Sequence, residues 1–130
     1  MPPRVLYAED NDISRDLTQA VLMAAGLDVV AVGWGQAGCD AFAQAAAEQR
    51  PFALVLLDMH MPDMTGLAVA RAVRAHPQGA DVPIVFLTGS VADGDEPAPD
   101  ELRITLTLLK PVTRTKLATL LGLLEPQSGS

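Results

Sequence analysis

The chain has 130 residues, of which 49% are hydrophobic and 19% are charged, and its formal net charge is −7. This length and composition favour one folded domain with a substantial core and exclude a mainly disordered chain. The negative charge argues against direct binding to nucleic acid, which requires basic surfaces. The single cysteine, Cys39, cannot form an intramolecular disulfide and suits a reducing compartment.

No apolar run is long enough to span a bilayer, and the first residues lack the apolar stretch of a signal peptide. We therefore expect a cytoplasmic protein without membrane attachment. The domain is expected to cover residues 1–125, and residues 126–130 are expected to be a flexible tail or the start of a linker.

Short apolar runs alternate with longer amphipathic segments along the chain. The first run ends at Ala8, Asn11 is placed to cap a helix, and Gly26 is placed to end it. Further strands are predicted at 27–32, 53–57, 84–87 and 106–109, and further helices at 41–49, at 65–75 and after Thr113. About five such alternations predict a doubly wound α/β fold, with a parallel sheet of five strands and helices on both faces.

The segment 89–103 breaks this alternation. It is rich in proline, glycine and acidic residues, and few of its apolar residues recur at helical spacing. We therefore expect the fourth helix to be short or irregular, covering at most residues 99–103.

Polar side chains follow four of the predicted strands, at the point where each strand ends. Glu9 and Asp10 follow the first strand, Asp58 the third, Thr88 the fourth and Lys110 the fifth. The carboxyl ends of parallel strands meet in one crevice, so we expect these five side chains to converge. Three close carboxylates repel one another unless a cation such as Mg²⁺ lies among them. A carboxylate held there can attack a phosphoryl group, which the lysine and the hydroxyl would stabilise.

Each of these residues has an ordinary interpretation when it is taken alone. A helix cap, a turn residue or a solvated lysine would explain Asp58, Thr88 or Lys110 separately. Chance convergence of all five at the ends of different strands is much harder to explain. The combination therefore favours a phosphoryl-transfer site.

These residues and their spacing resemble the receiver domains of response regulators in bacterial two-component signalling. The resemblance covers roughly residues 4–124, and the matching segments, in the family's order, are 5–11, the Asp-x-x-Met-Pro-x-Met-x-Gly pattern at 58–66, 83–88 and 110–111. It implies a flavodoxin-like sheet with strand order 2-1-3-4-5. A stand-alone receiver and a piece of a hybrid histidine kinase both fit the sequence.

The resemblance implies a metal-dependent phosphoacceptor. Asp58 corresponds to the aspartate that takes a phosphoryl group from the phosphohistidine of a histidine kinase or a phosphotransfer protein. Asp10 and Asp58 would bind Mg²⁺ (or Mn²⁺) directly, Glu9 through a water molecule, and His60 through its backbone carbonyl. Such a domain is not a conventional enzyme, although it assists its own phosphorylation and dephosphorylation. Its downstream protein partner is unknown.

The same resemblance assigns the remaining site residues. Thr88 corresponds to the switch hydroxyl, Lys110 to the cation that pairs with the phosphoryl group, and Met59 and Gly89 to backbone N–H donors to its oxygens. The bond between Lys110 and Pro111 is often cis in this family.

The chain also departs from the family's pattern. Thr107 stands where receivers usually carry an aromatic residue whose rotation follows the switch threonine. Together with the weak fourth helix, this substitution predicts intact phosphorylation with an unusual readout. A helical phosphodonor is expected to dock on the first helix, around Ile13, Ser14 and Leu17.

Three other interpretations remain open. Residues 33–38 match Gly-x-Gly-x-x-Gly, with Asp58 about twenty residues further on, as in a dinucleotide site. The motif follows the second strand and contains the bulky Trp34, so a glycine-rich surface turn is favoured. A zinc site of His60 and His76 with the acids is less favoured than a loop residue and a helix end. A receiver-like adaptor that works without phosphorylation is the third alternative.

Overall fold

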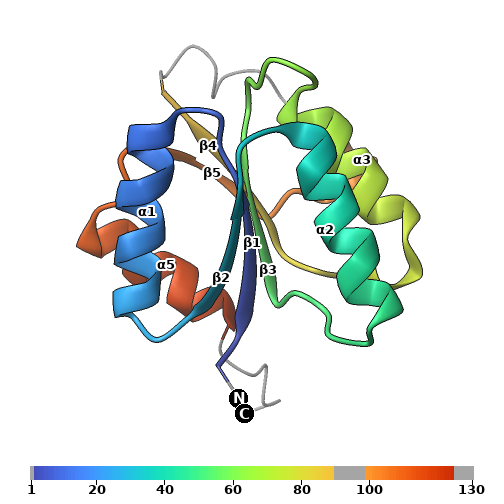
Figure 1. The fold of residues 1–130 in the computed structure, drawn as a ribbon, viewed down its shortest axis with the longest axis horizontal. Coiled ribbons are helices and arrows are strands. Elements are labelled where there is room, and N and C mark those ends of the chain that lie inside the picture. Colours follow the sequence, from blue (N-terminus) through green and yellow to red (C-terminus); the bar gives the residue numbers. More distant parts are fainter. Residues whose placement is uncertain (1, 90–98, 125–130) are drawn as a thin grey trace.

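The computed structural model describes residues 2–89 and 99–124 (Figure 1). Its five strands form one parallel sheet in the order β2-β1-β3-β4-β5, as expected. The strands are β1 (Arg4–Ala8), β2 (Asp28–Val32), β3 (Leu54–Asp58), β4 (Ile84–Thr88) and β5 (Leu106–Leu109). The order reverses at β1, so the crevice at the carboxyl ends of β1 and β3 is the expected ligand site.

Helices cover both faces of the sheet in the described part of the chain. They are α1 (Asp12–Ala24), α2 (Gly35–Ala47), α3 (Gly66–Ala75) and α5 (Arg114–Leu124). Helices α1 and α5 lie on one face, and α2 and α3 lie on the other (Figure 1). None of the described helices is long and apolar enough to cross a membrane.

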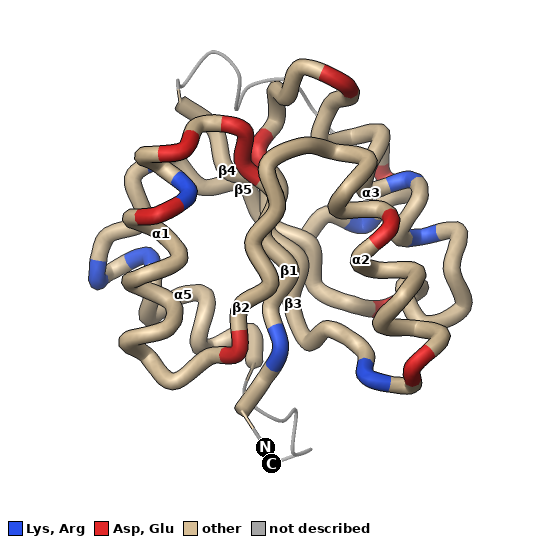
Figure 2. Tube along the Cα trace, in the orientation of Figure 1, with Lys and Arg blue, Asp and Glu red and all other residues tan. Residues whose placement is uncertain are grey.

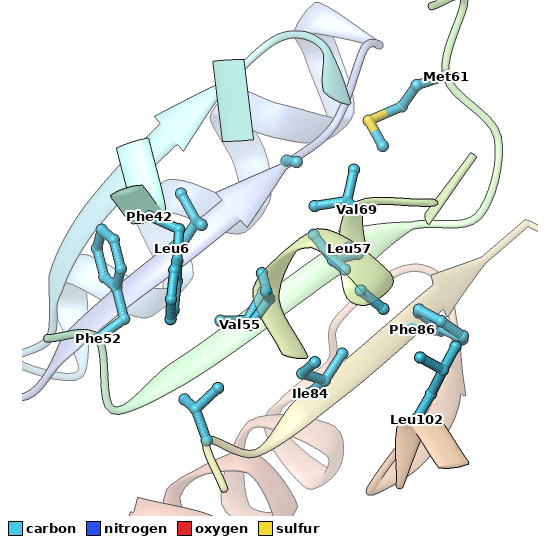
Figure 3. Packing of buried hydrophobic residues seen from close by; sticks show 14 of the residues in the cluster. Leu6, Phe42, Phe52, Val55, Leu57, Met61, Val69, Ile84, Phe86 and Leu102 are labelled. Carbon is cyan, nitrogen blue, oxygen red and sulfur yellow. The ribbon is translucent and has the colours of Figure 1, made fainter. Parts of the chain in front are cut away.

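Two hydrophobic clusters hold these layers together, one on each face of the sheet. Figure 3 shows the cluster under α2 and α3, where Val55, Leu57 and Phe86 of the sheet meet Phe42 and Val69 of the helices. Every residue of β3 is buried, because helices cover this central strand on both sides. The core therefore fixes the strand that ends at the candidate site.

Two helices begin where the sequence predicts. The Asn11 side chain caps α1 by accepting a hydrogen bond of 2.9 Å from the Ser14 N–H. The Thr65 hydroxyl caps α3 in the same way, through the Ala68 N–H at 3.2 Å. Both caps satisfy backbone donors that the first helical turn leaves unpaired.

Helix α2 begins at Gly35, six residues before the predicted start at residue 41. Gly35 and Gly38 are buried in its first turns, so the interpretation of residues 33–38 as a surface turn is wrong for these two glycines. The residue before the helix, Trp34, makes no capping hydrogen bond with its side chain. The local sequence therefore carries no start signal.

The connection between β4 and β5 is described at residue 89 and from residue 99 onward. It contains one short 3₁₀ turn, η2 (Asp100–Leu102), whose Leu102 is buried in the core under Phe86. This turn lies within residues 99–103, where the sequence predicts at most a short fourth helix. The expected tail, residues 126–130, lies outside the described residues.

Candidate functional site

Three of the predicted carboxylates meet at the carboxyl edge of β1 and β3. The Glu9 N–H donates to the Val32 carbonyl at 3.0 Å, which continues the sheet past the end of β1 and buries Glu9 completely. Asp58 is the last residue of β3 and is 6% exposed, whereas Asp10 is exposed to solvent. Oxygens of Glu9, Asp10 and Asp58 lie within 4.8 Å of one another. Figure 2 shows acidic positions gathered at this end of the sheet and at the start of α1.

Lys110 enters the same crevice from the end of β5. Its Nζ lies 2.6 Å from Glu9 Oε1 and 3.4 Å from Asp58 Oδ1. The Lys110 N–H donates to the Thr88 carbonyl at 2.7 Å, which keeps the ends of β4 and β5 together. Thr88 is buried at the end of β4, and the peptide bond between Lys110 and Pro111 is cis. All five strand-end residues therefore lie at one edge of the sheet.

The two buried carboxyl groups differ in acidity. Burial raises the pKa of Asp58 to about 7, and the Glu9 carboxylate adds to this shift while Lys110 opposes it. Burial also acts on Glu9, but hydrogen bonds with Asp58 and Lys110 outweigh it and lower the pKa of Glu9. The pKa of Lys110 is raised, because Glu9 and Asp58 outweigh its own burial. Without a metal ion, Asp58 is therefore the group of this cluster that carries a proton below about pH 7, while Glu9 and Lys110 form an ion pair.

The loop after Asp58 folds back tightly over the strand end. The Gly66 N–H donates to the Met59 carbonyl at 3.0 Å, and a Cβ atom at Gly66 would lie 2.6 Å from the Asp58 carbonyl oxygen. Only glycine fits at this close approach. The His60 N–H lies 3.4 Å from Asp58 Oδ1 and faces the site.

One expected donor is placed differently. The Met59 N–H donates to the Leu87 carbonyl at 3.2 Å, because Met59 continues the pairing of β3 with β4. It is therefore engaged in the sheet rather than directed at the phosphoryl position. The structure instead presents the His60 N–H to Asp58.

Among the residues that the structure describes, no contact of Thr107 or Gly89 defines a role for either residue. Thr107 pairs with Phe86 between β5 and β4, and its side chain is exposed on this edge strand. Gly89 follows β4 and has open space where a Cβ atom would be. The readout attributed to Thr107 and the donor role of Gly89 remain predictions.

Two further residues hold the site, and sequence reasoning missed both. Arg15 on α1 donates from Nη1 to the Glu9 carbonyl at 3.0 Å and from Nη2 to Asp12 at 2.5 Å. The spacing of Asp12 and Arg15 on a predicted helix was the available signal, and it indicates only a surface ion pair. Asp63 contacts α2 from the loop after β3, at a sequence separation that no local pattern reveals.

The donor chemistry fits a hard divalent cation. Three carboxylates offer oxygen ligands of the kind that Mg²⁺ and Mn²⁺ prefer. Within the described residues, this group of potential ligands contains no histidine. His76 instead packs edge-on against Phe42, with ring centres 5.8 Å apart, so the zinc interpretation has no support here.

The dinucleotide interpretation is also unsupported. A cavity of about 470 Å³ lies beside residues 33–38, and Asp10, Asp12 and the 56% exposed Trp34 line it. The two carboxylates would repel a pyrophosphate. Arg15, the cation in this cavity, is already paired with Asp12.

The strand order and the acidic crevice at the switch point define a flavodoxin-like α/β domain with a candidate metal site at the ends of its strands. The chain matches the response regulator receiver domain family over residues 5–122. It therefore belongs to this family and is a receiver domain of two-component signalling.

Relatives of two kinds share this domain. The sensor protein GacS of Pseudomonas syringae pv. syringae is 34% identical over 119 residues, which cover 89% of this chain but only 13% of GacS. The response regulator receiver protein CpdR of Brucella abortus is 38% identical over 109 residues, which cover 83% of this chain and 84% of CpdR. The domain thus matches part of a large sensor and most of a small regulator.

A solved structure supports the comparison of the crevice. The receiver domain of the sensor histidine kinase PA1611 from Pseudomonas aeruginosa PAO1 superimposes with a TM-score of 0.78 at 27% identity, covering 93% of this chain and 95% of that one. That structure holds a magnesium ion coordinated in its active-site cleft.

Proposed function

We propose that this receiver domain accepts a phosphoryl group on Asp58 from a phosphohistidine of a histidine kinase or a phosphotransfer protein, in a reaction that depends on Mg²⁺. The observation that carries the proposal is the meeting of Asp58 with Glu9, Asp10 and Lys110 at one sheet edge. This arrangement combines a nucleophilic carboxylate with groups for a cation and for a phosphoryl oxygen.

Each residue has a defined task in the proposed reaction. Asp10 and Asp58 would hold Mg²⁺ directly, Glu9 through water, and His60 through its carbonyl group. The bound cation would neutralise the negative charge of the carboxylates and of the incoming phosphoryl group. Lys110, at 3.4 Å from Asp58 Oδ1, is close enough to pair with a phosphoryl oxygen attached there.

The transfer itself exchanges one bond to phosphorus for another. An ionised Asp58 oxygen attacks the phosphorus atom, so that a P–O bond forms and the P–N bond to the donor histidine breaks. The electron pair of the P–N bond stays on the imidazole nitrogen. The ring leaves as neutral imidazole, with its proton either already on the other ring nitrogen or taken up by the leaving nitrogen. Asp58 must lose its proton first, because burial and Glu9 raise its pKa to about 7.

The first test is the intact mass of the chain after incubation with acetyl phosphate and Mg²⁺. The native chain should gain one base-labile phosphoryl group, and neither Asp58→Asn nor the native chain without Mg²⁺ should gain it. An equal gain in Asp58→Asn would place the acceptor elsewhere. No gain from acetyl phosphate or from a phosphorylated phosphotransfer protein would favour the adaptor without phosphorylation.

We further propose that the phosphodonor docks on α1 beside the crevice. Ile13 and Leu17 are 73% and 64% exposed and lie one helical turn apart, which is unusual for large apolar side chains. A cavity of about 330 Å³ next to them is lined by Ser14, Leu17, Thr18, Gly89, Lys110 and Pro111. A helical partner packed on this surface could bring its phosphohistidine to Asp58.

Charged substitutions on this surface separate docking from chemistry. Ile13→Glu or Leu17→Glu should slow transfer from a phosphorylated phosphotransfer protein by about tenfold or more, the usual scale for an interface hot spot. Phosphorylation by acetyl phosphate should be unchanged. Met23→Glu is the matched control, because Met23 is exposed on α1 but lies farther from the crevice end of the helix. Equal loss with both donors would indicate a folding defect and contradict the docking proposal.

A further inference from the structure

The amino end of α2 is capped by a residue from another part of the chain. Asp63, in the loop between β3 and α3, accepts the Gly35 N–H on Oδ1 and the Gln36 N–H on Oδ2, both at 2.8 Å. The residue that ordinarily supplies the cap, Trp34, makes no such bond. Asp63 thus satisfies two helix donors that would otherwise be unpaired, across 28 and 27 residues of sequence.

A second contact joins the same loop to the same helix. A Cβ atom at Gly35 would lie 2.1 Å from Met64 Cγ and 3.2 Å from Val69 Cγ2. Met64 therefore packs directly on the first turn of α2, and a side chain at position 35 would displace it. The loop is held against α2 by one polar and one apolar side chain, which are neighbours in sequence.

The near end of the loop is fixed by the site itself. Asp58 is held in β3, and Gly66 closes against the Asp58 carbonyl and bonds to the Met59 carbonyl. Between these points, the His60 N–H reaches Asp58 Oδ1 only at 3.4 Å, a long hydrogen bond. His60 lies in the stretch between Asp58 and Asp63, and Asp63 anchors the far side of this stretch to α2.

We propose that Asp63 is a positioning residue for the phosphorylation site, holding the loop after β3 against α2 so that the backbone of His60 faces Asp58. The inference rests on the proposed function, because phosphoryl acceptance is the task that this loop serves. Asp63 acts through the loop backbone and does not touch the reacting atoms. The N–H groups of Gln36 and Gly35 also keep the pKa of Asp63 below its usual range.

The cap also supplies its own reporter. Trp34 is the single tryptophan of the chain, precedes Gly35, and lines the cavity that contains Asp10. Its fluorescence should respond to a cation at Asp10 and can be used to titrate Mg²⁺. The measurement does not require phosphorylation, so it separates the role of Asp63 from the proposed function.

The test compares Asp63→Ala with Asp40→Ala. Asp40 is an exposed carboxylate on α2 that accepts a hydrogen bond from Gln36 Nε2 at 2.9 Å, so its removal takes the same charge from the first turns of the helix that Asp63 caps. Asp63→Ala should raise the Mg²⁺ dissociation constant about fivefold, the factor that corresponds to a typical lost N-cap. It should lower the rate of labelling by acetyl phosphate at subsaturating Mg²⁺ by a similar factor. Asp40→Ala should change both by less than about twofold.

Amide NMR signals provide the structural readout. In metal-free protein, Asp63→Ala should shift the signals of Met59 and His60 as well as those of Gly35 and Gln36. Asp63→Asn, which keeps one acceptor oxygen without the charge, should retain most of the native Mg²⁺ affinity. If Asp63→Ala does not fold, Asp63→Ser replaces it, because serine retains a short capping oxygen and its weaker hold should give an intermediate effect.

Unchanged signals of Met59 and His60 together with native Mg²⁺ affinity in Asp63→Ala would overturn the proposal. An equal loss of affinity in Asp40→Ala would also overturn it, because charge alone would then explain the effect. A third outcome separates the two proposals. If Asp63→Ala shows the loop shifts and the loss of Mg²⁺ affinity but the native chain takes no phosphoryl group, the proposed function is contradicted and the positioning role is supported.

Discussion

Asp58 is a carboxyl group whose ionisation its surroundings oppose. It is almost fully buried, its pKa is raised to about 7 by burial and then by Glu9, and Lys110 lies closer to Glu9 than to Asp58. The protonated form of Asp58 is therefore more strongly favoured in the folded chain than in the unfolded chain. A divalent cation bound beside Asp58, as proposed, would favour the ionised carboxylate and would therefore release a proton on binding.

The raised pKa of Asp58 predicts a stability that falls as pH rises. The pKa of Asp58 is 3.8 in the unfolded chain and about 7 in the folded chain. The contribution of Asp58 to the free energy of unfolding is therefore complete below pH 3.8 and is lost as the pH rises through about 7. Asparagine cannot ionise, so Asp58→Asn should be more stable than the native chain by about 1–2 kcal/mol at pH 8, after a discount for solvent screening. Urea unfolding at pH 5 and pH 8 without metal measures this difference.

Magnesium provides the control for this prediction. Millimolar Mg²⁺ should stabilise the native chain at pH 8 and leave Asp58→Asn almost unchanged, because binding to the folded state alone adds stability. Glu9, whose pKa is lowered, stays ionised over this interval and should not contribute to the difference. A native chain whose stability relative to Asp58→Asn is the same at both pH values would contradict the assignment of the proton to Asp58.

The site residues that could be predicted from the sequence are those that stand directly at the end of a predicted strand. Glu9, Asp10, Asp58 and Lys110 each follow an apolar run, and parallel pairing brings such positions together without further information. The engagement of the Met59 N–H with Leu87 could not be foreseen, because it depends on how far the pairing of β3 and β4 extends.

At the scale of elements, the predictable helices are those that carry their own caps. Asn11 and Thr65 mark the starts of α1 and α3 in the local sequence, and both starts were predicted to within one residue. Helix α2 was predicted to start six residues too late, because its cap, Asp63, belongs to a different loop. A cap supplied across the fold leaves no pattern in the sequence beside the helix.

Gly66 tests how tightly the loop after β3 closes on the site. In Gly66→Ala the new Cβ would lie 2.6 Å from the Asp58 carbonyl oxygen, so the backbone must move. We expect a loss of stability of about 1–3 kcal/mol, the scale of steric overpacking, and slower labelling by acetyl phosphate. The midpoint of urea unfolding and the labelling rate are the measurements.

Gly122 is the matched control. It lies inside α5, and a Cβ atom there would meet nothing within 4 Å. Gly122→Ala should therefore be stabilising by up to about 1 kcal/mol through helix propensity, without a change in labelling. A neutral Gly66→Ala with native labelling would show that the loop relaxes easily and that its tight closure does not matter.

At the scale of the whole molecule, Arg74 ties helix α3 to the segments that precede β4 and β5. Arg74 on α3 donates to the carbonyls of Gly79, Val82, Leu102 and Arg103 at 2.7–3.1 Å. The segment before β5 is therefore tied to α3 and to the start of β4, in the region where the fourth helix was expected to be weak. The guanidinium thereby anchors the end of the η2 turn, at Leu102 and Arg103, to α3.

Replacing this arginine should destabilise the whole domain. Arg74→Met keeps the length of the side chain but leaves several carbonyls without a donor, so we expect a loss of about 2–4 kcal/mol. Arg71→Met is the control, because Arg71 is more than half exposed and pairs only with the exposed Glu101 at 3.3 Å among the contacts described. That surface pair should contribute less than about 1 kcal/mol. Equal effects of the two variants on urea unfolding would contradict the anchoring role of Arg74.

The most direct test of the central claim is the chemical location of the acyl phosphate. The chain is incubated with acetyl phosphate and Mg²⁺, reduced with borohydride, and mapped by peptide mass spectrometry, since borohydride converts an aspartyl phosphate to homoserine. Reduction at residue 58, dependent on Mg²⁺, is the predicted result. Reduction at another carboxylate of the crevice, such as Asp10, or at no residue when the phosphoryl gain is present, would contradict phosphoryl acceptance by Asp58.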